Sequence, residues 1–470
     1  MKKTIFISFS AHTVLRNLFL FPGGFWDQCK AYGRTHPEVR FVVLMRKRDI
    51  PKYEYLFGGL SKDQFVLEIA DVPNPRTVLQ RLFRFLYAYL LYTNTTNILT
   101  TMGMRQDDPP AVGNRLLAPV RMALAFLGKT VPMIRKKLVP YLHARINPER
   151  PFADLFKKYS PKVVFGTHVY GLFDAYLIRE ARLQGVRSVA MPSGWDHIDK
   201  YNLPFQSDLL LVPSPQVRDH AIRFQGYDPE AVEVTGYQHF DYFISKDAYM
   251  PREELAKHLP ALSSGKYILY VSGSAYCPDE PDIIEEILGW VKEGAFGPDV
   301  KLVVRPYLGS RSKDRAFDEA KFARLADDPY VFYYDTKSWD TLLDGNIFLN
   351  LIRYAEVVMC VYSTVFLEAA LFDRPLVAAP FDGYAKRPLR RSIRRFADFE
   401  HFREVLDTGA IKEAYSFPEL RTALTDYFNN PSLDADKRER MRKEACYLLD
   451  GKASERTLQI VIREMEKATS

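Results

Sequence analysis

The stretch Cys360–Val377, CVYSTVFLEAALFDRPLV, carries the pattern that decides the fold. A short apolar run is followed by a small polar turn, Ser363-Thr364, and then by apolar residues at helical spacing. This order predicts a buried strand, a tight turn and a helix, the repeating unit of a parallel α/β sheet. One carboxylate, Glu368, interrupts the apolar helix one turn after Thr364. A polar group therefore occupies a position where the pattern predicts an apolar residue, which suggests a functional role for Glu368.

Apolar, β-rich runs of the same kind recur along the whole chain. In the first half they are Thr4–Ser10, Arg40–Arg46, Lys162–His168, Ser188–Gly194 and Asp208–Ser214. In the second half they are Tyr267–Ser274, Lys301–Tyr307, Tyr330–Asp335, Glu356–Ser363 and Pro375–Phe381. Helical patterns separate them, which favours a parallel sheet covered by helices on both faces. Since 470 residues exceed the size of one core, we predict an α/β protein with two doubly wound Rossmann-like domains facing a cleft.

The domain boundaries follow from the spacing of these runs. The first domain is expected over residues 1–245, with a basic amphipathic insertion at about 76–148. The second is expected over residues 262–440, and a C-terminal helical segment over 441–470, with its last helix at Ala453–Lys467.

Composition excludes several classes of protein. An apolar content of 47% indicates a folded chain, and four widely separated cysteines predict no disulfide framework, as in a reducing cytoplasm. No apolar run is long enough to predict a membrane-spanning helix. No His, Cys and Asp spacing is typical of a metal site, so neither a metal nor a cofactor is expected.

The positive charge is local. Between Arg76 and Arg145 eleven Lys or Arg residues face only Asp107 and Asp108, so this segment carries +9 and the rest of the chain about −2. Apolar residues between these cations predict contact with an anionic membrane surface; helices that pack on the sheet and expose a basic face are the alternative. A second basic run, Lys386–Arg395, would stack its arginines if it were helical. No nucleic-acid-binding module accompanies the charge, so nucleic acid is not an expected partner.

Ligands of parallel α/β sheets bind beyond the carboxyl ends of the strands, where helices begin. Ser363 and Thr364 lie at such a place, so their hydroxyls can face a diphosphate, and Glu368 can accept hydrogen bonds from a ribose diol. The alternative is an ordinary helix cap followed by a surface carboxylate.

Other residues of the second domain lie at equivalent strand ends. Ser272, Gly273 and Ser274 form a turn that could bring amides to a phosphate, although a plain turn fits equally. Arg305 ends the next strand and could neutralise a leaving diphosphate, or form an interdomain ion pair. Asp335 follows the third strand, where a nucleotide base is expected. Together these residues predict a nucleoside diphosphate as a ligand of the second domain.

In the first domain, three groups could take a proton from an acceptor hydroxyl. His12 follows the first strand and His168 follows a later one, and an imidazole titrates near neutral pH. Asp196 is the competing base, beside Trp195, whose ring could raise the pKa of the carboxyl group. The alternative for each histidine is a structural role.

A family resemblance accompanies these residues. The stretch STVFLEAALFDRPLV resembles the Ser-Thr-x-x-x-Glu-Ala…Pro motif of GT-B transferases that build bacterial surface carbohydrates. The segment from Gly194 to Phe243 is similar to their Ser-Trp-Asp-Asn region, and LLDGKASER to their Asp-Gly-x-Ala-Ser-Glu-Arg tail. The resemblance covers about residues 160–460. CDP-glycerol glycerophosphotransferases and non-hydrolysing UDP-GlcNAc 2-epimerases are related groups. Relatives often have Arg-Pro-His-Pro where this chain has Arg305-Pro306-Tyr307, so any chemistry of that histidine must be supplied otherwise.

The resemblance implies a metal-independent glycosyltransferase. It would move a sugar from a nucleotide-sugar donor to a cell-surface glycan or lipid-linked acceptor, in the cytoplasm or at the inner face of the plasma membrane. A glycerophosphotransferase, a 2-epimerase and a non-catalytic nucleotide-sugar-binding protein stay open as alternatives.

Overall fold

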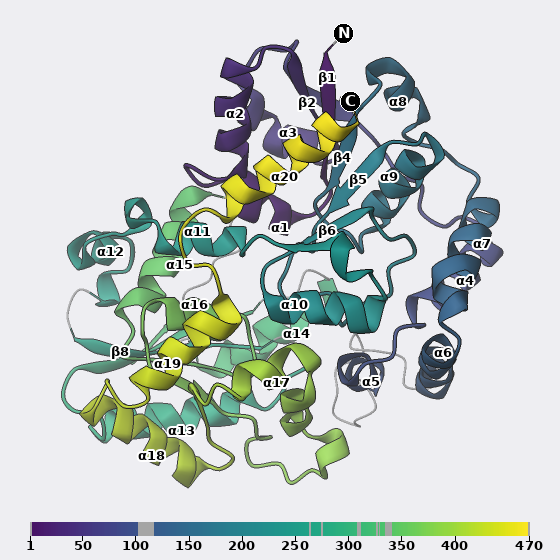
Figure 1. Cartoon of the computed structure of the whole chain (residues 1–470). Helices are drawn as coiled ribbons and strands as arrows, with labels where there is room; N and C mark the ends of the chain where they lie inside the picture. The colour runs from purple at the N-terminus through teal and green to yellow at the C-terminus, as the bar shows by residue number, and fades with distance from the viewer. Residues whose placement is uncertain are drawn as a thin grey trace. The chain divides into compact units, whose positions relative to one another are not determined.

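The computed structural model describes residues 2–101, 117–262, 265–273, 276–307, 312–325, 328, 330–333 and 341–468. It divides into two compact units (Figure 1). Unit 1 comprises Met1–Thr96, Pro119–Tyr242 and Leu448–Ser470, and unit 2 comprises Asn97–Ala118 and Phe243–Tyr447. Residues 441–447, which the sequence groups with the C-terminal helix, therefore lie in unit 2. Within the described residues, no helix has the length and hydropathy that crossing a bilayer requires.

Unit 1 is built on a seven-stranded parallel sheet in the order β3-β2-β1-β4-β5-β6-β7. Its strands are β1 Lys3–Phe9, β2 Val39–Met45, β3 Phe65–Ile69, β4 Val163–Gly166, β5 Arg187–Ala190, β6 Leu209–Val212 and β7 Val232–Val234. Its helices are α1 His12–Val14, α2 Phe25–Thr35, α3 Ile50–Tyr53, α4 Val78–Ala88, α6 Ala118–Thr130, α7 Val139–Ile146, α8 Ala153–Tyr159, α9 Leu172–Leu183, α10 Pro215–His220 and α20 Ala453–Lys467. Helices α5 Asn94–Thr101 and α11 Gln238–Ile244 span the unit boundaries, and the first residue of α6, Ala118, belongs to unit 2.

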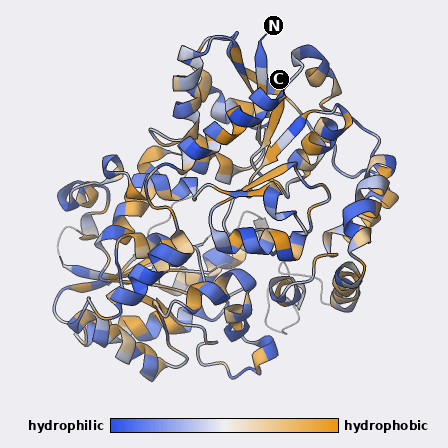
Figure 2. Cartoon of the chain, in the orientation of Figure 1, coloured by the Kyte–Doolittle hydropathy of each residue, from blue (hydrophilic) through white to orange (hydrophobic). Residues whose placement is uncertain are grey.

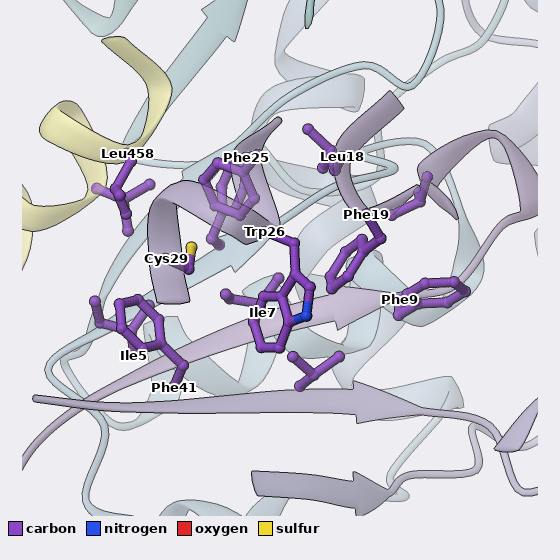
Figure 3. Packing of buried hydrophobic residues seen from close by; sticks show 14 of the residues in the cluster. Ile5, Ile7, Phe9, Leu18, Phe19, Phe25, Trp26, Cys29, Phe41 and Leu458 are labelled. Atoms are coloured by element: carbon purple, nitrogen blue, oxygen red, sulfur yellow. The ribbon is translucent and has the colours of Figure 1, made fainter. Parts of the chain in front are cut away.

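Alternate side chains of β1 enter the two apolar layers of unit 1, because successive residues of a strand point to opposite faces. Ile5 and Ile7 pack with Phe41 and Trp26 on one face (Figure 3). Phe6 packs on the other face with residues of α8 and α9. Continuous apolar strands are what burial on both faces requires.

Helix α20 begins and ends where the sequence predicts and completes the first of these layers. It packs against α2, β4 and β5, and its Leu458 lies in the same cluster as Phe25 and Cys29 (Figure 3). The Asp241 carboxylate accepts hydrogen bonds from the Ala453 and Ser454 amides at 3.1 and 2.8 Å, which caps the helix.

The described residues of the predicted insertion form helices, and those of Asn97–Ala118 belong to unit 2. The inner face of α4 places Phe83 and Tyr87 against Val139 of α7. His143 of α7 is almost fully buried, and its ring contacts Phe83, Tyr87, Tyr176 and Phe205 at centroid distances of 5.0 to 6.2 Å. This aromatic cage attaches α7 to α9.

Unit 2 repeats the plan with a six-stranded parallel sheet, ordered β10-β9-β8-β11-β12-β13. Its strands are β8 Lys266–Val271, β9 Val300–Arg305, β10 Val331–Tyr333, β11 Val357–Cys360, β12 Leu376–Ala378 and β13 Ile411–Glu413. Its helices are α12 Arg252–His258, α13 Glu280–Lys292, α14 Ser312–Phe322, α15 Leu342–Tyr354, α16 Val365–Leu371, α17 Glu400–Leu406, α18 Phe417–Asn429 and α19 Ala435–Met441. Counted from β8, the strand order is 3-2-1-4-5-6, that of a doubly wound fold.

Residues coloured as hydrophobic in Figure 2 concentrate on the strands of the two sheets. In unit 2 they form one main cluster that includes Ile268, Leu302, Met359 and Val377 from four neighbouring strands. Each sheet therefore has its own core, and the predicted α/β architecture of two Rossmann-like parts is confirmed.

Candidate functional site

The turn after β11 has the strand–turn–helix form that the sequence predicts. The Ser363 hydroxyl accepts a hydrogen bond from the Val365 amide at 3.4 Å, while Thr364 already has helical dihedral angles. Both residues are half-buried. The side-chain oxygen of Ser363 thus helps to start α16, at the carboxyl edge of the sheet where a ligand is expected.

Glu368 is buried, with 4% of its surface exposed. This excludes the alternative in which it is an ordinary surface charge. Its carboxylate also acts on the neighbouring Cys360: burial raises the pKa of that thiol most, and the charges of Glu280, Cys277 and Glu368 raise it further. A buried carboxylate is retained where other groups stabilise its charge, so its presence in the apolar helix suggests a role.

The Ser272-Gly273 turn after β8 is held from within unit 2. The Ser272 amide donates to the Arg305 carbonyl at 3.0 Å, and the Gly273 amide donates to the Glu280 carboxylate at 2.7 Å. The Ser272 hydroxyl accepts a hydrogen bond from the Tyr307 amide at 2.8 Å. Because these amides already have partners, the geometry does not support a phosphate-binding role for them.

Glu280 and Lys321, which sequence reasoning missed, fasten this turn. Their side chains form a buried ion pair at 2.7 Å, and Lys321 also donates to the Gly273 and Cys277 carbonyls at 3.3 and 3.1 Å. Tyr270 donates a further hydrogen bond to Glu280. Burial raises the pKa of Glu280, and Lys321 and the Gly273 amide partly offset it. Glu280 begins an amphipathic helix, where a glutamate is common, so the sequence alone did not indicate this ion pair.

Arg305 ends β9, as predicted, and is half-buried. Its guanidinium group lies over the ring of Phe348 in α15, with 4.5 Å between the Cζ atom and the ring centroid. A guanidinium group stays charged at physiological pH, which suits binding of an anion.

A hollow of about 650 Å³ opens beyond β12 and β13 in unit 2. Its lining includes Arg387, Arg394, Tyr384 and Tyr415 and none of the predicted donor-binding residues. The basic run that borders it is not α-helical. Two short 3-10 turns, Leu389–Arg391 and Ile393–Asp398, are separated by Ser392 in an extended conformation, so the helix that would stack the arginines is not formed.

Three of the predicted site side chains lie outside the described part of the chain. Ser274 and Asp335 lie outside the described residues, and the imidazole of His12 lies outside the described part as well, although His12 begins α1 directly after β1. Among the residues that are described, no three His, Cys, Asp or Glu side chains gather closely enough to hold a metal ion.

In unit 1, His168 lies after β4 in a hydrogen-bonded chain of side chains. Its Nδ1 atom is 2.8 Å from the Ser193 hydroxyl, which is 2.9 Å from the Tyr170 hydroxyl, and that hydroxyl contacts His197. Burial lowers the pKa of His168; Asp174 opposes this effect and Arg46 adds to it. A neutral imidazole, the form that accepts a proton, is therefore favoured near neutral pH.

Asp174 in the first turn of α9 anchors this loop and was not singled out from the sequence. Its buried carboxylate accepts hydrogen bonds from Ser8 and Ser10, at 2.6 and 2.7 Å, and from the His168 amide at 3.1 Å. It thereby ties the end of β1 to the end of β4. An acidic residue in a first helical turn is common for electrostatic reasons, so its position alone did not mark it.

Asp196 lies in the loop after β5 and forms an ion pair with Lys200, and its carboxylate is 3.6 Å from His197 Nε2. Burial would lower the pKa of Lys200, but Asp196 outweighs it, so that pKa is raised. Trp195 is buried as expected, yet the neighbouring ammonium group stabilises the charged carboxylate. His168 and Asp196 thus belong to one polar cluster at the carboxyl edge of unit 1, with Ser193, Tyr170 and His197.

Solved structures of known proteins share this architecture. A putative UDP-N-acetylglucosamine 2-epimerase from Listeria monocytogenes has a TM-score of 0.55 and 13% identity, over 99% of this chain and 98% of that one. The UDP-GlcNAc 2-epimerase from Neisseria meningitidis bound to UDP-GlcNAc gives 0.53 and 12%, over 98% and 100%. A glycosyltransferase from Rickettsia africae gives 0.50 and 11%, over 99% of each chain.

No protein-family model and no curated protein matches the sequence. The likeness of the solved structures extends over nearly the whole chain and, at these identities, concerns the fold. Together with the two parallel sheets, it shows that the chain has the GT-B fold that these epimerases and this glycosyltransferase share.

Proposed function

We propose that the chain is a glycosyltransferase that moves a sugar from a nucleotide-sugar donor to a cell-surface glycan or a lipid-linked acceptor at the inner face of the plasma membrane. The observation that carries the proposal is the buried carboxylate of Glu368, one turn after Ser363-Thr364 at the carboxyl edge of unit 2. Structures of this fold with bound UDP and UDP-GlcNAc support a nucleotide-sugar ligand.

In this proposal unit 2 holds the donor. Glu368 accepts hydrogen bonds from the two ribose hydroxyls, and the diphosphate lies by the turn of Ser363 and Thr364. Arg305, stacked on Phe348, neutralises the charge that grows on the leaving nucleoside diphosphate.

Unit 1 supplies the base. Neutral His168 or the Asp196 carboxylate takes the proton of an acceptor hydroxyl, whose oxygen then attacks the anomeric carbon of the sugar. The bond from that carbon to the diphosphate oxygen breaks, and the electron pair leaves with the nucleotide. Ser193 fixes the ring of His168 through its hydrogen bond to Nδ1, and the Tyr170 hydroxyl is in turn hydrogen-bonded to Ser193.

The ribose role is tested by calorimetry after a thermal-shift screen with UDP, CDP, GDP and CMP has identified the base. Glu368→Gln is expected to weaken nucleotide binding about 10- to 100-fold, because hydrogen bonds to a charged group are lost. A 2′-deoxy nucleotide should bind more weakly than its ribose form to the native chain, but not to this variant. Glu253→Gln, an exposed carboxylate of α12, is the matched control. Equal affinities of the native chain and Glu368→Gln would reject the role.

A second candidate is a 2-epimerase, since several structures of this fold carry that name. The two activities differ in what they need. An epimerase interconverts the free nucleotide sugar by itself, whereas a transferase releases nucleoside diphosphate in step with glycosylated acceptor. Chromatography of the nucleotide sugars, with and without a lipid-linked acceptor, separates them.

A further inference from the structure

The helices inserted between β3 and β4 of unit 1 combine two features that seldom occur together on a protein surface. The first is one-sided charge. The described residues 76–101 and 117–148 contain nine Lys and Arg residues and no Asp or Glu. Intramolecular carboxylates therefore do not neutralise these cations within the segment, and an anionic surface would attract them.

The second feature is exposed apolar area on α4. Its inner face buries Gln80, Phe83 and Tyr87. On the outer side Leu79 is 57% exposed and Leu82 52%, and Val78 and Leu86 are exposed as well. Arg81 and Arg84 are interleaved with them. Helix α4 therefore leaves these apolar side chains exposed, in addition to those that its own packing buries.

Helix α6 and the residues after it continue the pattern. Phe126 is 58% exposed. The other exposed large apolar side chains here are Val120, Met122, Leu127, Val131, Met133, Leu138 and Tyr141. With the four from α4, twelve of the twenty-five exposed large apolar side chains in the described residues belong to this segment. Figure 2 shows the mixture on α4, α6 and α7 as alternating apolar and hydrophilic bands.

These elements lie against one another. Helix α4 packs on α7, and a side-chain carbon added at Gly128 of α6 would collide with the Leu90 carbonyl oxygen just after α4. Arg121 and Lys129 of α6 extend over the rings of Tyr89 and Tyr92, at 4.8 and 4.4 Å. The exposed side chains thus belong to one group of packed helices.

A hollow of about 480 Å³ opens on this group. Its lining includes Arg81 and Arg84 with Phe85 and Tyr89. Two arginines in one hollow suit a phosphate monoester or diester, because a guanidinium group can donate two parallel hydrogen bonds to phosphate oxygens.

We propose that α4, α6 and α7 form a docking surface for an anionic phospholipid bilayer. The apolar side chains enter the headgroup and upper acyl region, the cations contact lipid phosphates, and the Arg81–Arg84 hollow receives one headgroup. A bilayer supplies phosphates and an apolar medium at the same place, which matches both features. The inference deepens the proposed function, since it would bring the chain to a lipid-linked acceptor.

The test is sedimentation with vesicles of phosphatidylglycerol and phosphatidylcholine at about 0.15 M salt. The native chain should bind these vesicles, and bind pure phosphatidylcholine far more weakly. Arg81→Ser with Arg84→Ser should weaken binding about 30-fold, since each cation contributes about a fivefold factor near an anionic surface. Leu79→Ser with Leu82→Ser should weaken it more than about tenfold, because two apolar side chains no longer leave water.

Matched controls come from the same unit. Arg48 and Lys52 are exposed cations and Leu183 is 56% exposed, all outside this surface. Their serine variants should bind like the native chain, and all variants should keep the native thermal unfolding. Equal losses in the controls would overturn the proposal, as would failure of the native chain to bind anionic vesicles. A native dimer that Leu79→Ser with Leu82→Ser disperses in light scattering would also overturn it, because a second copy would then be the occupant.

The vesicle assay contains no donor, and the nucleotide assay contains no lipid. A native chain that binds nucleotide but not anionic vesicles would therefore refute the docking surface alone. A native chain that binds vesicles but not nucleotide would refute the donor site alone.

Discussion

Lowering the pH should destabilise unit 1 through one side chain, His143. Its ring lies inside the aromatic cage of Phe83, Tyr87, Tyr176 and Phe205, and its Nδ1 atom is 3.4 Å from the Arg179 guanidinium. Burial, and then the charge of Arg179, lower the pKa of His143 from 6.5 to about 4. Because the folded pKa is depressed, stability is complete above about pH 6.5 and is lost as the pH falls towards 4.

The size of the effect follows from that difference. At about 1.4 kcal/mol per pH unit, protonating His143 only in the unfolded chain costs about 2 kcal/mol at about pH 5 and about 3 kcal/mol at about pH 4. His143→Leu removes the titration. At neutral pH this substitution should cost about 1.5 kcal/mol or less, since the side-chain volumes are similar.

Urea unfolding of the native chain and His143→Leu, at a series of pH values between about 7.5 and 5, measures the free energy of unfolding for each. Relative to the variant, the free energy of unfolding of the native chain should fall by about 2 kcal/mol across that range, so the variant becomes the more stable of the two near about pH 5. His258→Asn, at an exposed histidine of α12, should leave the pH dependence unchanged. Parallel stability curves for the native chain and His143→Leu would refute the reasoning.

Two further predictions concern the polar clusters. Lys321→Met should destabilise unit 2 by about 3–5 kcal/mol in urea unfolding, because it leaves the buried Glu280 charge without its cation. Adding Glu280→Gln should recover part of this loss; no recovery would contradict the ion-pair account. His168→Gln should slow turnover about 100- to 10,000-fold. Since the pKa of His168 is lowered, native activity should persist below about pH 6.5, and a rate profile that declines from a higher pH would contradict His168 as the base.

The sequence predicted those strands whose apolar runs are continuous. The run Thr4–Ser10 corresponds to β1, Lys3–Phe9, because burial on both faces leaves no polar position in its middle. The strands β3, β7 and β13 were missed. They stand at or next to the sheet edges, are short or half-exposed, and so lack that signal.

The sequence predicted where the candidate site residues lie better than it predicted which side chains they contact. A parallel sheet places strand ends at one edge, so Ser363, Glu368 and His168 could be placed from the pattern alone. The hydrogen-bond partners of these residues could not be predicted in this way. Ser193 is 25 residues from His168, and only the folded loops bring the two side chains together.

The packing of α20 has a consequence for how the chain is made. Phe25 and Cys29 share their apolar layer with Leu458, which is translated much later. During translation that layer must stay open to water, or to a chaperone, until α20 has emerged from the ribosome. Closure of this layer is therefore expected only after α20 has been translated, so truncation before α20 would yield an aggregation-prone product rather than a shorter folded chain.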